Sequence, residues 1–378
     1  MTSNDYSEDK LIQESTAELL EHELGWESVF AFDKEVFGEN GTLGRMSQYE
    51  VLLRPRFKAA LKRLNPWLTD KQMEEALLAM TEHMSSASLM QTNEEKYRYI
   101  RDGIPVTCYK PNGEKDERRA LVIDFREGHQ EENDFLAVRE LTVRGALYER
   151  RADLVCFVNG LPLVFMEVKN HDIAVENAYN DNYSDYLVSI SQLFYYNAFS
   201  ILSNGIDARI GTIGSKWEFF NHWKRLVEEE AGNIELPTML RGVLNKKNLL
   251  DLVENFILYD HSDGKNVKIL ARNHQYLGVN QAVEMYRHRK ELQKKSKHVD
   301  VTDISVVINH IINDHLDIDE NGVDSSHEDH PIIDISKINF DILRREFAKS
   351  KRKNLVMRDL QDMLQERLAR MMAVNSNL

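Results

Sequence analysis

Two apolar runs joined by a tight-turn dipeptide constrain this chain more than any other part of its sequence. The first run is DLVCFV, residues 153–158, and the second is LPLVFMEV, residues 161–168. Only Asn159 and Gly160 separate them. An Asn-Gly pair readily adopts the positive φ angles of a two-residue hairpin turn. The pattern therefore predicts a buried β-hairpin.

Charged residues interrupt the far end of this predicted hairpin. Asp153 lies six residues before the turn and Glu167 seven residues after it, so the two carboxylates come close to facing each other across the strands. Lys169 follows Glu167 by two residues and projects from the same face. Burying such groups is costly unless they are paired or used. The hairpin therefore gathers two carboxylates and an ammonium at one place.

This combination of side chains suits the hydrolysis of a phosphodiester. Asp153 and Glu167 can hold a hard cation such as Mg²⁺, which polarises the phosphate and lowers the pKa of a bound water. Lys169 can orient that water or stabilise the charge that develops on the phosphate oxygens. The alternative is a salt bridge at a strand end, because the spacing D-x13-E-x-K also occurs by chance.

The order of the other predicted elements indicates an α/β domain. Apolar residues at three- and four-residue spacing predict an amphipathic helix over residues 10–26, ended by Gly25. The remaining stretches predict helices over residues 49–64, 70–84 and 175–200, and strands over residues 106–110, 119–125, 135–143 and 208–214. A domain of roughly 200 to 260 residues accommodates this order.

The composition limits the classes of partner. A net charge of -14 argues against a protein that coats nucleic acid by bulk attraction, so any contact with DNA needs a local basic surface or help from partners. We expect no membrane association, because no apolar run approaches the ~20 residues of a membrane helix. The acidic N-terminus does not resemble a secretory signal, and two cysteines form no disulfide framework. A cytoplasmic location is expected.

Residues 151–170, RADLVCFVNGLPLVFMEVKN, resemble the nuclease signature of the restriction (R) subunit of type I restriction–modification enzymes, a branch of the PD-(D/E)xK superfamily. The resemblance extends over residues 133–145 and 192–212, and covers most of residues 10–260. It implies a restriction-endonuclease-like core with a mixed central sheet flanked by helices. It also implies that Asp153 and Glu167 bind Mg²⁺ and that Lys169 completes the site.

The same resemblance implies helper residues around this site. The family uses a glutamate on its first helix, and Glu14 fits that position best, with Glu18 as the competitor. Many members carry a Gln-x-x-x-Tyr pair after the lysine. Here the expected glutamine position holds Asp181, and Tyr186 is a candidate for the tyrosine. A literal pair, Gln192 and Tyr196, occurs later in the chain, and both pairs stay open.

The later part of the chain predicts helices and no motor. Residues 269–290 resemble the segment that leads into the ATP-driven translocase of R subunits, but no G-x-x-x-x-G-K-[ST] loop follows. Residues 333–371 resemble the family's C-terminal helical region. We therefore expect a nuclease domain over residues 1–260, a helical linker over 261–298 and a C-terminal helical assembly region over 299–378. The family uses ATP, whereas we expect no ATP site in this chain.

An acidic segment between the last two helical stretches matches the spacing of a calcium loop. Asp317, Asp319, Asn321, Gly322 and Glu328 stand at the expected loop positions. Asp324 occupies a position that is normally apolar, and Pro331 interrupts the exit helix. An acidic linker explains the segment better.

The sequence therefore predicts a type I site-specific deoxyribonuclease. We expect Mg²⁺-dependent cleavage of double-stranded DNA without base-reading residues of its own, in a complex with modification and specificity subunits. Two alternatives remain: a non-catalytic scaffold that docks on the modification and specificity core, and a stand-alone defence nuclease.

Overall fold

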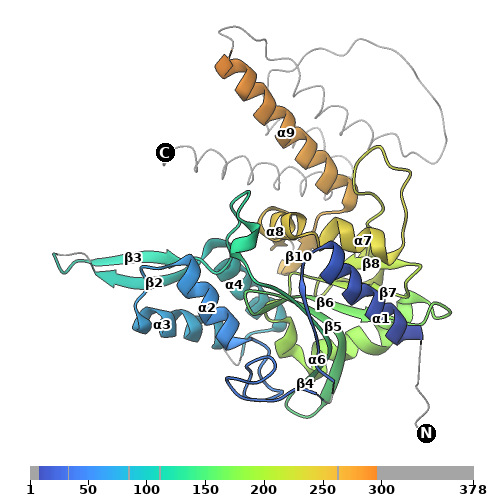
Figure 1. Cartoon of the computed structure of the whole chain (residues 1–378), viewed down its shortest axis with the longest axis horizontal. Coiled ribbons are helices and arrows are strands. Elements are labelled where there is room, and N and C mark those ends of the chain that lie inside the picture. Colours follow the sequence, from blue (N-terminus) through green and yellow to red (C-terminus); the bar gives the residue numbers. More distant parts are fainter. Residues whose placement is uncertain (1–7, 33, 84–85, 110–111, 262–263, 296–378) are drawn as a thin grey trace. The chain divides into compact units, whose positions relative to one another are not determined.

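The computed structural model describes residues 8–32, 34–83, 86–109, 112–261 and 264–295 (Figure 1). The chain divides into two compact units, Met1–Arg272 and Asn273–Leu378. The described part of the second unit is helix α9, Asn273–Lys295. The calcium-like loop over residues 317–328 and the assembly region over residues 299–378 lie outside the described residues. The three predicted domains stay predictions.

A six-stranded mixed sheet forms the centre of the first unit (Figure 1). Its order is β1-β4-β5-β6-β7-β8. The pairs β1–β4 and β6–β7 are parallel, and the other neighbours are antiparallel. The bounds are β1 Glu27–Phe30, β4 Phe135–Arg144, β5 Glu149–Val158, β6 Leu161–Val168, β7 Phe199–Ser203 and β8 Ala208–Gly211. The predicted α/β fold with a mixed sheet is confirmed.

Helices pack against this sheet, and further helices make up the rest of the first unit. Helix α1 (Glu8–Glu18) contacts β4 and β6, and α6 (Ser184–Ser189) contacts β5. The π-helical turn η1 (Leu19–Glu23) prolongs α1, as the predicted helix over residues 10–26 requires. The other helices of eight or more residues in the described part of the first unit are α2 Arg54–Leu64, α3 Asp70–Thr81, α4 Leu89–Asp102, α7 Leu236–Val243 and α8 Lys246–Asn255.

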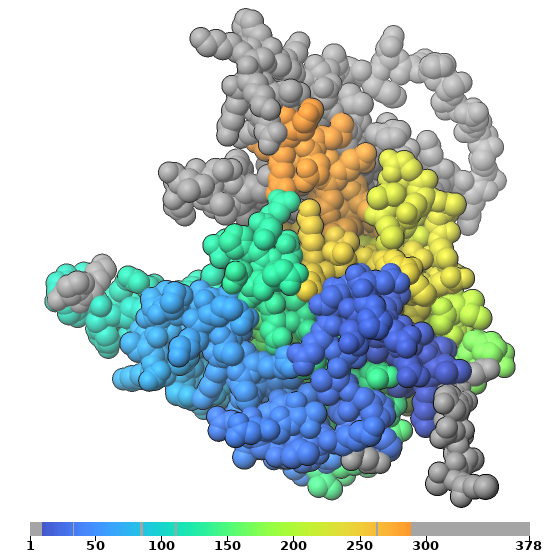
Figure 2. Space-filling view, in the orientation of Figure 1, coloured from blue at the N-terminus to red at the C-terminus, as the bar shows by residue number. Residues whose placement is uncertain are grey.

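The strand predicted over residues 119–125 is mostly wrong. Strand β3 (Lys115–Ala120) pairs with β2 (Ile104–Tyr109) in a separate ribbon, which projects from the unit in Figures 1 and 2. Beyond Ala120, side-chain amides take the place of a partner strand. The Asn65 side chain accepts a hydrogen bond from the N–H of Leu121, and the Asn159 amide donates to the carbonyl of Val122. These local partners satisfy the backbone without strand pairing.

Short elements also differ from the predicted pattern. The helix predicted over residues 175–200 is broken into α5 (Val175–Asn177), η3 (Ala178–Tyr183), α6 and η4 (Ser191–Phe194), and strand β7 begins at Phe199. Strands β9 (Ile257–Asp260) and β10 (Val267–Leu270) form a two-stranded sheet that the pattern does not indicate. None of the described helices is long and apolar enough to cross a membrane.

The predicted hairpin is confirmed and is closed by its Asn-Gly turn. Asn159 and Gly160 have φ angles of 50° and 79°. A register shift lies just before the turn, between Cys156 and Phe157 of β5. Asp153 lies six residues before the turn and Glu167 seven after it, and the shift compensates for this difference of one residue. Leu154 therefore pairs with Met166. The next positions along the two strands are Asp153 and Glu167, which the shift therefore places opposite each other.

Replacing Gly160 with alanine tests how closely this turn is packed. The added Cβ would lie 2.6 Å from the carbonyl oxygen of Leu53 and 2.9 Å from the nitrogen of Phe57, at a φ angle that disfavours side chains. We expect Gly160→Ala to lower the free energy of unfolding, measured by urea titration, by about 3 kcal/mol.

Gly113→Ala is the matched control. Gly113 has a φ of 81°, but an added Cβ would meet no atom within 4 Å. We expect Gly113→Ala to lower the free energy of unfolding by only ~1 to 2 kcal/mol, the cost of placing a side chain at a left-handed φ. Equal losses from the two variants would contradict the close packing of the turn.

Candidate active site

The structure brings together the three residues of the predicted carboxylate–lysine site. Asp153 and Glu167 occupy facing positions on β5 and β6, as the neighbouring pair Leu154 and Met166 shows. The Lys169 Nζ lies 3.5 Å from Glu167 Oε1. Burial raises the pKa of Glu167, and the negative charge of Asp153 raises it further, as expected for carboxylates at close range. The geometry therefore provides the charge cluster that the spacing predicts.

Hydrogen bonds from two elements hold the Asp153 carboxylate. Its Oδ2 accepts from the backbone N–H of Val168 at 2.8 Å, and its Oδ1 accepts from the Gln13 amide at 3.0 Å. Val168 directly follows Glu167, so the same strand that carries the second acid also orients the first. Gln13 comes from α1 and is buried. Asp153 is thus fixed from two elements.

Glu167 is the most unusual group of the site, because it is a carboxylate with only 2% of its surface exposed. Its Oε2 is buried and accepts no hydrogen bond within the described structure. Burial raises the pKa of Glu167 well above its usual range, and the charge of Asp153 raises it further, while Lys169 offsets part of the effect. A buried oxygen of this kind, beside a second carboxylate, fits the coordination of a cation.

Lys169 is held by a residue that the sequence reasoning missed. Its Nζ donates to Asn182 Oδ1 at 2.5 Å, and the Asn182 amide lies 3.4 Å from the hydroxyl of Tyr186. That hydroxyl donates to the carbonyl of Arg151. Asn182 and Tyr186 are four residues apart, which is the spacing of the Gln-x-x-x-Tyr pair expected from the resemblance. Counting four residues back from Tyr186 would have found Asn182.

The other suggested pair lies elsewhere. Gln192 donates to the carbonyl of Arg144 at 2.8 Å, and the buried Tyr196 donates to the carbonyl of Met80 at 2.8 Å. Both side chains are therefore engaged with backbone away from the carboxylates. Asp181, at the expected glutamine position, precedes the residue that binds Lys169.

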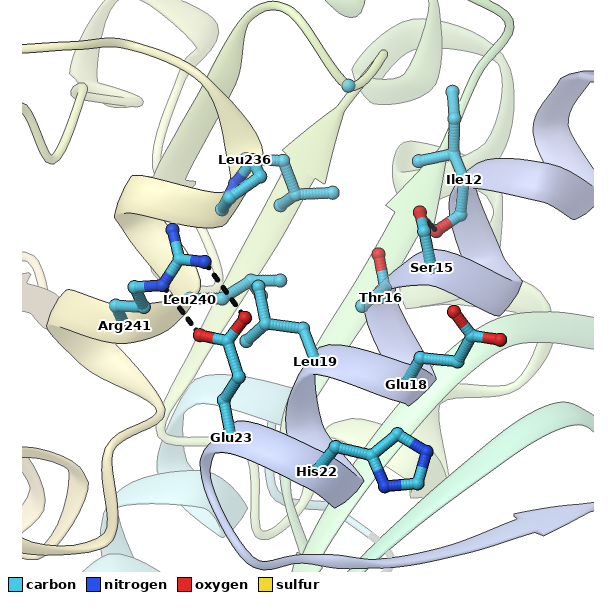
Figure 3. A pocket seen from close by; sticks show the side chains of 12 residues that line it. Ile12, Ser15, Thr16, Glu18, Leu19, His22, Glu23, Leu236, Leu240 and Arg241 are labelled. Atoms are coloured by element: carbon cyan, nitrogen blue, oxygen red, sulfur yellow. Dashed lines mark hydrogen bonds and ion pairs between the residues drawn. The ribbon is translucent and has the colours of Figure 1, made fainter.

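The first helix presents an amide, not an acid, to Asp153. Glu14 is exposed, whereas its neighbour Gln13 reaches the site. Glu18 is exposed and lines a groove of about 410 Å³ against α7, together with His22 and Leu240 (Figure 3). The ion pair between Glu23 and Arg241 lies at the same groove. The catalytic role of Glu14 stays a prediction.

The donor set of the site is small. Within the described parts of the chain, no group of three or more His, Cys, Asp and Glu side chains is arranged to hold a metal ion. Asp153 and Glu167 supply two carboxylates. Mg²⁺ commonly binds through one or two carboxylates together with waters and substrate phosphates, so two acids fit this ion better than Zn²⁺, which takes at least three protein ligands.

Comparison with known proteins points to one family. The family described as "Type I restriction enzyme R protein N terminus" matches residues 5–219. The type I restriction enzyme HindI endonuclease subunit of Haemophilus influenzae is 32% identical over 271 residues, which cover 69% of this chain and 25% of that protein. A Methanocaldococcus jannaschii protein provisionally named as such a subunit is 28% identical over 265 residues, covering 64% and 24% of the two chains.

More distant relatives match over a similar span. The type I restriction enzyme SauCOLORF180P endonuclease subunit of Staphylococcus aureus is 22% identical over 274 residues, which are 69% of this chain and 27% of the relative. The matched part is thus about a quarter of the length of these curated relatives.

The buried carboxyl of Glu167 should make the stability of the metal-free chain depend on pH. Because its pKa is raised on folding, the folded chain retains this proton at a pH where the unfolded chain has lost it. The free energy of unfolding should therefore fall as the pH rises above the ordinary value of 4.5. In EDTA at pH 8, we expect Glu167→Gln to be more stable than the parent by about 1 to 3 kcal/mol, and by less at pH 5.

Glu14→Gln is the control for this urea titration, since its carboxyl is exposed on α1. It should change stability equally at the two pH values. A difference between parent and Glu167→Gln that is the same at pH 5 and pH 8 would contradict the raised pKa.

Proposed function

Because this chain belongs to the family of type I restriction enzyme R protein N-termini, we propose that it is the DNA-cleaving part of such a subunit. The reaction is Mg²⁺-dependent hydrolysis of phosphodiester bonds in double-stranded DNA. The relatives are named as endonuclease subunits, which supports a nuclease acting within an assembly. The unsatisfied Oε2 of Glu167 beside Asp153 is the observation that carries the metal dependence.

Asp153 and Glu167 are the residues that would hold the ion. When bound, Mg²⁺ supplies polarisation of the scissile phosphate and a water of lowered pKa. The chain itself contributes orientation. Gln13 and the Val168 N–H keep the Asp153 carboxylate in place before any substrate arrives. Such preorganised polar groups avoid reorganisation during the reaction.

Lys169 is the cation that acts on the substrate. Its side chain is 20% exposed, and its Nζ lies 3.5 Å from Glu167 Oε1, so that it can meet a phosphate bound beside the carboxylates. Asn182 directs the ammonium, and Tyr186 steadies Asn182 through the 3.4 Å contact. In the transition state Lys169 stabilises the negative charge on the phosphate oxygens.

Target recognition belongs to the partners in this proposal. We infer that modification and specificity subunits bind the chain and supply the sequence readout, in the cytoplasm where the DNA is met. The sequence has no G-x-x-x-x-G-K-[ST] loop. ATP hydrolysis is therefore not expected from this polypeptide by itself, although type I enzymes use ATP.

Plasmid nicking tests the assigned site. We expect Lys169→Ala to cut the rate of Mg²⁺-dependent nicking by about 100-fold or more, because it removes a group that acts on the transition-state charge. Asp153→Asn should remove activity and EDTA should abolish it. Nicking is followed on supercoiled plasmid, with the chain alone and with its modification and specificity partners and ATP.

Lys247→Ala is the matched control, because Lys247 is 63% exposed and pairs with Glu127. It should nick at the parental rate. Equal nicking by Lys169→Ala and the parent would contradict the assigned site. A parent that nicks no DNA under either condition, yet still binds the partners, would favour the scaffold alternative. Nicking that the partners and ATP leave unchanged would favour a stand-alone nuclease.

A further inference from the structure

A third acid lies in line with the two proposed metal ligands. Strand β4 pairs Arg139 with Leu154 and Leu141 with Ala152, so the position between them, Glu140, faces Asp153. Glu140 has a φ of 56°. Among the described residues, the turn residue Asn159 is the other non-glycine with a positive φ. A left-handed residue inside a strand costs about 1 to 2 kcal/mol, which suggests that the site requires this placement.

Glu140 is engaged by an arginine and not arranged as a metal ligand. Its Oε2 lies 2.5 Å from Nε of Arg151, and its side chain is 6% exposed. The Arg151 side chain is 46% exposed, and its guanidinium lies 4.3 Å from the centre of the Phe32 ring. A buried carboxylate and an aromatic ring thus fix a half-exposed guanidinium. No hydrogen bond of its two Nη groups is found among the described residues.

The position of Arg151 relates this guanidinium to the proposed cleavage site. Arg151 precedes Asp153 by two residues on β5, so the two side chains leave the same side of the strand about 7 Å apart. DNA that places a phosphate at Asp153 and Glu167 can place a neighbouring phosphate at this distance along the strand. A guanidinium with free N–H groups suits a phosphate because its fork can donate two parallel hydrogen bonds.

We propose that Arg151 binds a backbone phosphate next to the scissile one, with Glu140 and Phe32 as the residues that position it. This assignment rests on the proposed DNA-cleaving function. The chain has a net charge of -14, so DNA needs a local positive group to stay at an acidic site. The buried Glu140 holds the half-exposed guanidinium of Arg151 at the surface, where it can meet a phosphate. Arg151 reads no bases, so its contact is independent of sequence.

The salt dependence of DNA binding tests the assignment. The full chain with Lys169→Ala serves as the parent, so that a short fluorescent duplex stays intact in Mg²⁺. Affinity is measured by anisotropy over a range of salt concentrations. We expect Arg151→Gln to weaken binding about tenfold and to lower the slope of log K against log salt by about one, the loss of one phosphate contact.

Arg118→Gln is the matched control. Arg118 also pairs with a carboxylate, Asp116 at 3.5 Å, and lies over an aromatic ring, Trp67 at 5.7 Å, but on the β2–β3 ribbon. Its slope should equal that of the parent. Phe32→Leu should weaken binding at an unchanged slope, because it loosens the guanidinium without removing its charge. A change in affinity at an unchanged slope would show that Phe32 positions Arg151 and does not itself contact a phosphate.

A double variant keeps the test valid if Arg151→Gln leaves Glu140 unpaired and fails to fold. Glu140→Gln with Arg151→Gln removes both charges, and should lower the slope by the same amount. An unchanged slope in a folded Arg151 variant would overturn the assignment while leaving the proposed function intact. A parent that binds no duplex, either alone or with its modification and specificity partners, would instead overturn the proposed function, and the assignment with it.

Discussion

Two carboxylates facing each other across neighbouring strands, one of them almost wholly buried, form the constraint on which the rest of the site depends. Charges so placed repel, and burial strengthens the repulsion. The surrounding residues offset part of this repulsion. The Val168 N–H and the Gln13 amide stabilise Asp153, and Lys169 compensates part of the charge on Glu167. One oxygen of Glu167 still has no partner within the described structure. That remaining deficit is the reason to expect a cation.

The hairpin follows from local chemistry, which is why the sequence predicted it, whereas the register shift that sets Asp153 opposite Glu167 was not predicted. Asn159 and Gly160 accept positive φ, and the apolar runs bury both strands. Asn182 could not be placed in the same way, because its approach to Lys169 depends on how the segments η3 and α6 follow one another. Likewise, Gln13 and not Glu14 faces Asp153 because of the rotation of α1 about its axis, which apolar spacing defines only to within a residue. Tertiary contacts decide both.

An acidic chain can bind the proposed DNA substrate if positive side chains lie at the site itself. Lys169 and Arg151 are the cations beside the carboxylates, and each is held by a partner that leaves it partly exposed. Each pairs with a carboxylate, Lys169 with Glu167 and Arg151 with Glu140, and Lys169 is also held by the Asn182 amide. Lys169 is the residue proposed to act on the charge of the transition state, and Arg151 is the one proposed to hold the substrate. The matched span is about a quarter of the curated relatives. In the proposed function, target recognition belongs to the partner subunits.

Metal binding is the claim on which this account rests. Titration of Mn²⁺, a paramagnetic substitute for Mg²⁺, followed by electron paramagnetic resonance, measures it directly on the full chain. The account predicts a site on the parent that Glu167→Gln and Asp153→Asn each weaken by about tenfold or more, a loss found even for residues that only orient a ligand. Mn²⁺ binding of unchanged affinity in both variants would contradict it.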